Sequence, residues 1–451
     1  MAFKKDFTWG VASASYQIEG AAREDGKEPS VWDMFCRKPG AVWQGQNGDV
    51  ACEHYYRYRE DIALMKRIGV RASRFSVSWP RVLPAGVGPI NDKGLDFYDR
   101  LVDEYLAAGI EPWLTLFHWD YPLALYHRGG WLNRESADWF AEYARVLATR
   151  LGDRVTHWMT HNEPQCFIIL GHQDGIHAPG DKLRFDEIVR AMHHAMLAHG
   201  RGVMAIRAHA ARKPTVGIAM VAVTRMPNTE TPADIEAART VMFEEPSRNG
   251  FLFNAWWFDA MLKGAYPAEG LKLFGEAAPD IQPGDMAIIA QPLDFLGANI
   301  YNGRHVAATL QGPQLVPLPA GYPKTTQDNW PITPTCLYWG PRFLHERYGL
   351  PIVITENGCQ VADVISLDGR VHDPQRIDYL HRHLLELRRA AADGVDVGGY
   401  FQWCFTDNFE WALGDAVRVG LVYTDYPTQR RIPKDSAAWY GDVIRTNGAE
   451  L

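Results

Sequence analysis

Two glutamates end strand-like segments in similar settings, although they lie almost 200 positions apart. Glu163 closes the β-branched and aromatic run 155–162 and is followed by a proline, which cannot donate to a sheet. Glu356 closes the apolar run 351–355 and is followed by the turn pair Asn-Gly. If both strands are parallel in one barrel, both carboxyl groups point into one cleft at its C-terminal rim. Facing carboxyl groups there indicate acid/base and nucleophilic chemistry on a sugar acetal.

Other polar and aromatic residues end or follow strand-like segments, and each alone has a structural explanation. A strand arginine is often part of an ion pair, and a histidine or tryptophan at a strand end is more often a core residue than a functional one. One inward side chain from many strands nevertheless makes a pocket. The candidates are Arg74, His118, Trp119, Asn162, Asn299, Tyr301 and Trp403, with Gln17 and Glu19 after the first strand.

Strand-like and helix-like segments alternate along the whole chain. Strand patterns cover 7–12, 72–79, 110–119, 155–162, 215–221, 294–299, 351–356 and 397–403. Apolar residues have helical spacing over 54–68, 94–108, 134–151, 185–208, 251–262 and 374–392. Eight strands in such an alternation favour a closed (β/α)8 barrel, the TIM barrel, over an open doubly wound sheet, and no G-x-G-x-x-G follows the first strand.

No linker divides the sequence, so we expect residues 1–451 to form a single catalytic barrel domain. The connections 28–53, 222–248 and 302–348 are long and rich in proline, glycine and aromatic residues. Loops of that length are usually functional. The expected architecture is therefore a single barrel with long βα loops around its site.

The composition is that of an ordinary globular protein, with 47% hydrophobic and 22% charged residues. The formal net charge is −8 and no long basic run occurs, which argues against nucleic acid as a partner. Six cysteines lack any paired spacing, so free thiols in a reducing compartment are expected. The N-terminus has no secretory pattern and no apolar run reaches about 18 residues, which predicts a cytoplasmic protein without a membrane span.

Several segments resemble, in order, those of the β-glucosidases of glycoside hydrolase family 1. The two strand-end motifs are Thr-His-Asn-Glu-Pro at 160–164 and Ile-Thr-Glu-Asn-Gly at 354–358. Further matching segments lie at 7–10, 15–20, 74–81, 117–120, 407–411 and 433–440, so that the resemblance covers nearly the whole chain. It implies a retaining β-glycosidase that hydrolyses terminal β-D-glucosyl residues, with galactosyl or fucosyl residues as further candidates. Small β-glycosides and oligosaccharides would be its partners, and assembly into a homo-oligomer stays open.

The resemblance also implies a role for each matching residue. Glu163 would be the general acid/base and Glu356 the nucleophile. Arg74 and Tyr301 would contact the nucleophile, with Asn299 close by. The residues expected to bind the sugar and its aglycone are Gln17, His118, Trp119, Asn162, Asn299, Tyr301, Trp330, Trp403, Glu410 and Trp411, with Trp403 under the sugar ring and Trp330 at the aglycone entrance.

Two departures from the family pattern are visible. The stretch 299–302 lacks a second aromatic residue that members commonly carry, and the segment 412–417 differs from the usual loop after the Glu-Trp pair. The first departure is expected to have little effect on catalysis. The second concerns the contacts around the 6-position of the sugar.

The chemistry explains why these residue types are needed. In a retaining hydrolase the carboxyl groups lie about 5–5.5 Å apart, so that one attacks the anomeric carbon while the other protonates the departing oxygen. A cation such as Arg74 favours the ionised nucleophile, and the negative Glu356 should raise the pKa of Glu163. No cofactor or metal is required by this mechanism. His193 and His194 lack a metal-binding spacing and are expected at the surface or in packing.

Other functions remain as alternatives at this level. A 6-phospho-β-glycosidase of the same fold would be expected to replace the Glu410-Trp411 pair by small and basic residues. A transglycosidase would use the same covalent intermediate with a different acceptor. A thioglucosidase-like member would be expected to lack Glu163, and a carbohydrate-binding module would not need the glutamate pair.

Overall fold

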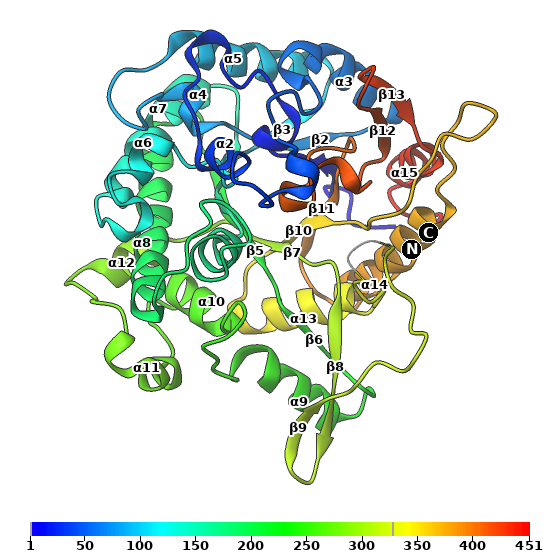
Figure 1. The fold of residues 1–451 in the computed structure, drawn as a ribbon. Coiled ribbons are helices and arrows are strands. Elements are labelled where there is room, and N and C mark those ends of the chain that lie inside the picture. The colour runs from blue at the N-terminus through cyan, green and yellow to red at the C-terminus, as the bar shows by residue number, and fades with distance from the viewer. Residues whose placement is uncertain (1, 327–328) are drawn as a thin grey trace.

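The computed structural model describes residues 2–326 and 329–451, and its centre is a closed barrel of eight parallel strands (Figure 1). Around the ring the order is β1-β11-β10-β7-β5-β4-β3-β2. The strands are β1 (Thr8–Ala12), β2 (Ala72–Ser76), β3 (Glu111–Phe117), β4 (His157–Asn162), β5 (Thr215–Val221), β7 (Leu296–Asn299), β10 (Ile352–Asn357) and β11 (Val397–Trp403). The expected (β/α)8 barrel is thereby confirmed.

One long helix follows each barrel strand and lies outside the ring (Figure 1). These helices are α3 (His54–Ile68), α5 (Asp92–Ala107), α7 (Ser136–Leu151), α8 (Phe185–His209), α10 (Asn254–Leu262), α13 (Cys336–Tyr348), α14 (Pro374–Ala392) and α15 (Asp435–Arg445). Two of them, α13 and α15, were not expected from the sequence. Pro341 lies inside α13, and an internal proline normally argues against a helix.

The three long connections are more ordered than expected. They contain α2 (Val31–Phe35), β6 (Thr224–Pro227), α9 (Pro232–Phe243), β8 (Gly303–Thr309) and β9 (Gly312–Leu315). Strands β6, β8 and β9 form a small separate sheet that projects from the barrel beside α9 (Figure 1). The loops after β5 and β7 are therefore joined in one small sheet.

Short elements occupy the remaining connections. They are α1 (Ser15–Ile18), α4 (Trp79–Val82), α6 (Leu123–Tyr126), α11 (Ala268–Phe274), α12 (Asp285–Ile289), a π-helix (Cys166–Gln173), 3-10 segments at Glu24–Gly26, Trp43–Gly45, Gly130–Leu132, Gly275–Ala277 and Trp411–Ala416, and the hairpin β12 (Val422–Asp425) and β13 (Arg430–Pro433). Among the described residues, no helix is long and apolar enough to cross a membrane.

Two strands end earlier than their sequence patterns predicted. β2 stops at Ser76, and Trp79 begins α4 instead of ending the strand. The following Pro80 suits the first turn of a helix, where its missing N–H costs nothing. β3 stops at Phe117, so that His118 and Trp119 lie in the loop just beyond the strand.

Aromatic side chains from different strands fill the barrel interior. The ring of Trp113 lies 5.4 Å from that of Phe295 and 5.0 Å from that of Phe401. Two glycines make room for them, because a Cβ on Gly10 would lie 2.4 Å from the ring of Phe401 and one on Gly217 would lie 2.5 Å from that of Phe295. The barrel is thus a packed core, with space for a ligand only beyond it.

Candidate active site

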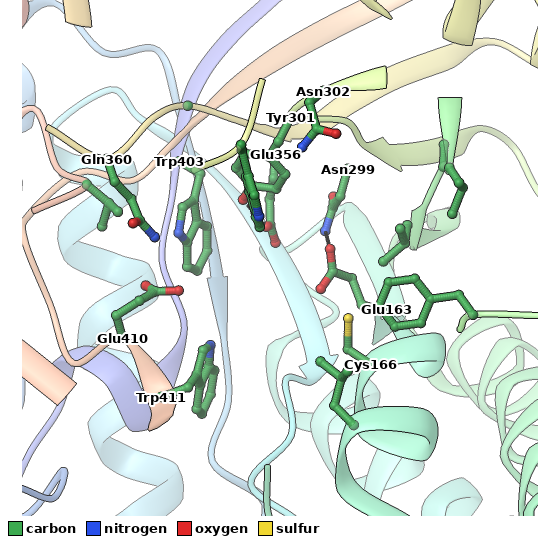
Figure 2. Close-up of a pocket in the computed structure, with 18 of the residues that line it drawn as sticks. Glu163, Cys166, Asn299, Tyr301, Asn302, Glu356, Gln360, Trp403, Glu410 and Trp411 are labelled. Carbon is green, nitrogen blue, oxygen red and sulfur yellow. Dashed lines mark hydrogen bonds between the residues drawn. The ribbon is translucent and has the colours of Figure 1, made fainter. Parts of the chain in front are cut away.

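A cavity of about 550 Å³ contains both glutamates (Figure 2). The side chains of Glu163 and Glu356 point into the same space in Figure 2, and both residues are buried. The sequence-predicted residues that line the cavity with them are His118, Trp119, Asn299, Tyr301, Trp330, Trp403, Glu410 and Trp411. Three further predicted residues, Gln17, Arg74 and Asn162, are fully buried and contact members of this lining.

Both carboxylate oxygens of Glu356 accept a strong hydrogen bond. Arg74 donates from Nη1 to Oε1 at 2.5 Å, and the hydroxyl of Tyr301 donates to Oε2 at 2.6 Å. Arg74 also donates to Asn162 and to Thr115, which fixes its guanidinium. A buried carboxylate is stable when it is paired in this way. The site therefore holds Glu356 ionised, in one orientation.

Glu163 has a different environment, although it is equally enclosed. Its Oε1 accepts a hydrogen bond from the amide of Asn299 at 2.9 Å, and no lysine, arginine or histidine of the described chain pairs with it. Burial, and after it the negative charge of Glu356, raise the pKa of Glu163 to about 7. Hydrogen bonds from Asn299 and Cys166 and the charge of Arg74 lower it by smaller amounts. A protonated carboxyl group is therefore available near neutral pH.

The Asn162 side chain connects the two halves of the site. Its Oδ1 accepts from Arg74 at 2.5 Å and from Asn299 at 3.1 Å, while its Nδ2 donates to Nε2 of His118 at 3.0 Å. His118 must therefore carry its proton on Nδ1. Burial, together with the charge of Arg74, lowers the pKa of His118 well below the usual range, which keeps the ring neutral. Nδ1 has no partner among the described residues and can donate to a ligand hydroxyl.

A second polar group lies beside β1 and the loop after β11. The amide nitrogen of Gln17 donates to Asn408 at 3.2 Å, to the Phe409 carbonyl at 3.0 Å and to Glu410 at 3.3 Å. The Gln17 Oε1 is buried and accepts from no group of the described protein, so it can accept from a ligand hydroxyl.

Indole rings surround these polar groups. The Trp411 ring lies 4.6 Å from that of Trp119, and the Trp403 ring is stacked on His118 at 5.7 Å. Trp330 remains 40% exposed, with its ring 5.3 Å from that of Tyr301, and so lies on the open side of the cavity. Flat apolar faces beside convergent donors and acceptors are the features of a carbohydrate pocket.

Asn299 is adjacent to Glu356 in the strand register, and its amide donates to Glu163 and Asn162. One expectation about an individual residue needs correction. Glu19 does not reach the cavity, because its carboxylate is bound by Arg81 at 3.0 Å and by Tyr98 at 2.7 Å. His193 is buried and bonded to Asp285, in line with a packing role.

Several lining residues were not predicted from the sequence. They are Cys166, Leu170, His177, Val223, Arg225, Phe251, Asn302, Thr325 and Gln360, among others. Cys166 could have been found, since it begins the helix three positions after Glu163. The others come from long connections whose course depends on tertiary contacts. Among the described residues, no group of three or more His, Cys, Asp or Glu side chains could hold a metal ion.

Comparison with known proteins identifies the family of the chain. The model of glycosyl hydrolase family 1 matches residues 1–449. The chain belongs to glycosyl hydrolase family 1. The "Beta-glucosidase A" of Thermotoga maritima is 45% identical over 99% of both chains. The structure of the β-glucosidase of that organism in complex with glucoimidazole is 44% identical, with a TM-score of 0.90 over 99% of both chains.

Another relative is named for a different activity. The aryl-phospho-β-D-glucosidase of Bacillus subtilis is 40% identical and covers 100% of this chain and 98% of its own. Members of the family are retaining glycosidases, and this chain is a glycoside hydrolase of the same kind.

Proposed function

We propose that this family 1 enzyme hydrolyses terminal, non-reducing β-D-glucosyl residues, with Glu356 as nucleophile and Glu163 as general acid/base. The observation that carries the proposal is the contrast between two carboxyl groups in one cavity. Glu356 is bound by a cation and a phenol, whereas Glu163 is bound by two uncharged groups, the amide of Asn299 and the thiol of Cys166, and has a pKa of about 7. Different environments of two acids in one site assign their roles.

In the first step, a Glu356 oxygen attacks the anomeric carbon, and the bond from that carbon to the aglycone oxygen breaks. The proton of Glu163 passes to the departing oxygen. The glycosyl ester formed on Glu356 carries no negative charge, so one cause of the raised pKa of Glu163 disappears. Glu163 then takes a proton from water, which attacks the same carbon and releases Glu356.

The sugar-binding roles follow from the donors and acceptors of the cavity. We assign the glycone hydroxyls to Gln17, His118, Asn162, Glu410 and Trp411, and the face of the sugar ring to Trp403. Trp119 supports this group through Trp411, and Asn299 and Tyr301 hold the two carboxyl groups. Trp330, on the open side, is assigned to the aglycone.

A 6-phospho-β-glycosidase is the main alternative, because one relative bears such a name. Glu410 lines the cavity beside Gln17 and would repel a phosphate on the sugar. A panel of aryl β-glycosides with and without a 6-phosphate tests this point. We expect β-glucosides, and some β-galactosides or β-fucosides, to be cleaved faster than 6-phosphoglucosides. Faster cleavage of the phosphorylated substrates would overturn the assignment.

The stereochemistry of the product tests the double displacement. NMR spectra recorded during the first turnovers of an aryl β-glucoside should show the β-anomer of glucose before mutarotation produces the α-anomer. Initial release of the α-anomer would mean inversion, which needs carboxyl groups about 6.5–9.5 Å apart. A transglycosidase would also retain the configuration, but would give glycosyl transfer to an added alcohol in preference to hydrolysis.

We further propose that residues 1–451 form one catalytic domain acting on small β-glycosides in the cytoplasm. Residues 1, 327 and 328 of that range lie outside the described residues. The pairing of β1 with β11 joins the two ends of the chain, which supports one cooperative unit. All six cysteines are buried and free, as expected in a reducing compartment. A single calorimetric unfolding transition is expected, and two separable transitions would contradict one domain.

A further inference from the structure

Arg225 lines the cavity, and it is not among the residues assigned to the sugar. It belongs to β6, which begins three residues after the end of β5. The lining also includes Val223 and Phe251, and Trp330 lies on the open side of the cavity. The wall around Arg225 thus combines apolar and aromatic surface with one positive charge.

This arginine lacks the partners that the chain gives its other buried arginines. Among the described residues, no carboxylate lies within 4.0 Å of its guanidinium and no aromatic ring lies under it. The one hydrogen bond that its side chain makes to the described residues is a long contact of 3.4 Å from Nη1 to the Thr224 carbonyl. Its Nε is buried without any partner in the described protein. Burial lowers the pKa of Arg225, the charge of Glu245 raises it, and the charge of Arg304 lowers it by a smaller amount.

Three other arginines of the chain are buried and paired with a carboxylate. Arg74, Arg81 and Arg376 are fully buried, and each is bonded to a carboxylate, namely Glu356, Glu19 and Asp363 respectively. Burying a charge is unfavourable unless it is paired. An arginine that remains charged, half-buried and unpaired against a cavity therefore leaves hydrogen-bonding capacity that a ligand can use.

Arg304 increases the positive charge of this wall. It is the register partner of Arg225 in the parallel pairing of β6 with β8, and its own side chain is exposed. In parallel strands, register partners project to the same face of the sheet. No salt bridge to Arg304 occurs in the described part of the chain. The wall thus attracts an anion, while the three acids of the cavity, Glu163, Glu356 and Glu410, repel one from the sugar side.

We propose that Arg225 binds a carboxylate on the aglycone, so that aromatic β-glucosides with an acidic aglycone are preferred substrates of this enzyme. The guanidinium fork matches both oxygens of a carboxylate, and Phe251 and Trp330 suit the faces of an aromatic ring. This inference rests on the proposed function, because it names the substrate class of the same cavity. The binding is non-covalent and leaves the two chemical steps unchanged.

The test compares 4-carboxyphenyl β-D-glucoside with 4-carbamoylphenyl β-D-glucoside, which has a neutral amide in place of the acid. The ratio of kcat/KM for the acid to that for the amide is measured in the wild type, Arg225→Gln and Arg212→Gln. Arg212 is an exposed arginine outside the cavity. Because the same ratio is compared between proteins, the intrinsic difference between the two leaving groups cancels.

We expect the ratio to fall about 10-fold or more in Arg225→Gln, as for loss of a hydrogen bond between charged groups, and to be unchanged in Arg212→Gln. The preference of the wild type should also weaken as salt is raised. Arg225→Lys, which keeps the charge but not the fork, should give an intermediate ratio. An equal effect of Arg225→Gln on both substrates would reduce Arg225 to a structural part of the wall and overturn the inference.

Two further measurements separate the possible failures. If the wild type cleaves 4-nitrophenyl β-D-glucoside, but the acid-to-amide ratio of kcat/KM is the same in the wild type and in Arg225→Gln, only the proposed carboxylate site is wrong. If it cleaves no β-glucoside, the proposed function is wrong as well. Should the variants fail to fold, inhibition of the wild type decides: 4-hydroxybenzoate should bind about 10-fold more tightly than 4-hydroxybenzamide, and equal binding would overturn the inference.

Discussion

At the scale of single residues, two glutamates of one cavity differ in protonation because their neighbours differ. Glu163 and Glu356 are both buried, and each faces the charge of the other. Glu356 receives hydrogen bonds of 2.5 and 2.6 Å from a cation and a phenol, and Glu163 receives one of 2.9 Å from an amide. The stronger partners hold the negative charge on Glu356. The proton therefore resides on Glu163, which is what protonation of a leaving group requires.

The raised pKa of Glu163 predicts the alkaline side of the pH profile. In the proposed first step Glu163 acts in its protonated form, so kcat/KM for an alkyl β-glucoside should fall as the pH rises through about 7. Above that pH the decline should approach about tenfold per pH unit. The profile is measured over a pH series in which the protein stays folded. A flat profile from pH 6 to 9 would contradict the assignment of Glu163 as the acid.

The sequence predicted which residues meet, but not how they are bonded. Glu163, Glu356, Arg74 and Trp403 could be placed in one pocket because the C-terminal ends of parallel strands share one rim. The proton position on His118 and the partner of Asn299 depend on tertiary contacts, and so could not be predicted. The same holds for the backbone: Glu163 has a φ of 47°, a left-handed conformation that non-glycine residues adopt at some energetic cost.

At the scale of secondary elements, periodicity located most of the barrel and failed where local and tertiary preferences conflict. Helix α3 and strand β5 were predicted with their observed bounds, since their apolar spacing is regular. Helix α13 was missed, because an internal proline opposes a helix locally while its buried face packs against the barrel. β6 has only four residues, and β8 pairs with β6 and β9 outside the barrel, so neither strand was predicted from its sequence pattern.

A glycine in α8 permits the close approach of α12. A Cβ on Gly200 would lie 1.9 Å from the carbonyl oxygen of Ile288, a backbone atom that cannot turn aside. Gly200→Ala should therefore destabilise the protein by about 1–3 kcal/mol or more, as overpacking does. This cost exceeds the gain of about 0.5–1 kcal/mol that alanine brings to a helix interior. Urea unfolding of both proteins measures the difference.

Gly398→Ala in β11 is the control for that substitution. Its added Cβ would first meet a side-chain methyl group of Val353 at 3.3 Å, which can move. We expect a much smaller loss of stability than for Gly200→Ala. Equal stability of Gly200→Ala and the wild type would show that α12 can shift without cost.

At the scale of the whole molecule, a buried ion network attaches the C-terminal segment to the catalytic loops. Lys434, just before α15, donates to Asp363 at 2.6 Å and to Asp407 at 2.7 Å. Asp363 lies in the loop after β10 and is also bound by Arg376 of α14 at 2.8 Å. The side chains of Lys434, Asp363, Asp407 and Arg376 have no solvent exposure. The loops that follow Glu356 and Trp403 are thereby fixed from outside the cavity.

Removal of one charge from this network should be costly. Lys434→Met leaves Asp363 and Asp407 buried with fewer cations, and should lower the free energy of unfolding by about 3–5 kcal/mol. The exposed pair of Lys4 with Asp396 provides the control, since Lys4→Met should cost at most about 1 kcal/mol. Chemical denaturation of both variants gives the two values. Similar small losses would mean that the network adds little to stability.

The roles of the two glutamates are tested most directly by varying the leaving group in Glu163 variants. In Glu163→Gln, a dinitrophenyl β-glucoside needs no acid, so it should give a burst of phenol followed by slow turnover, because deglycosylation lacks its base. Alkyl and cellobiose-like substrates should lose about 10²–10⁴-fold in rate. Azide should restore turnover of the aryl substrate by Glu163→Ala and give the β-glycosyl azide. Equal slowing of good and poor leaving groups, with neither burst nor azide rescue, would contradict the assignment of Glu163 as acid/base.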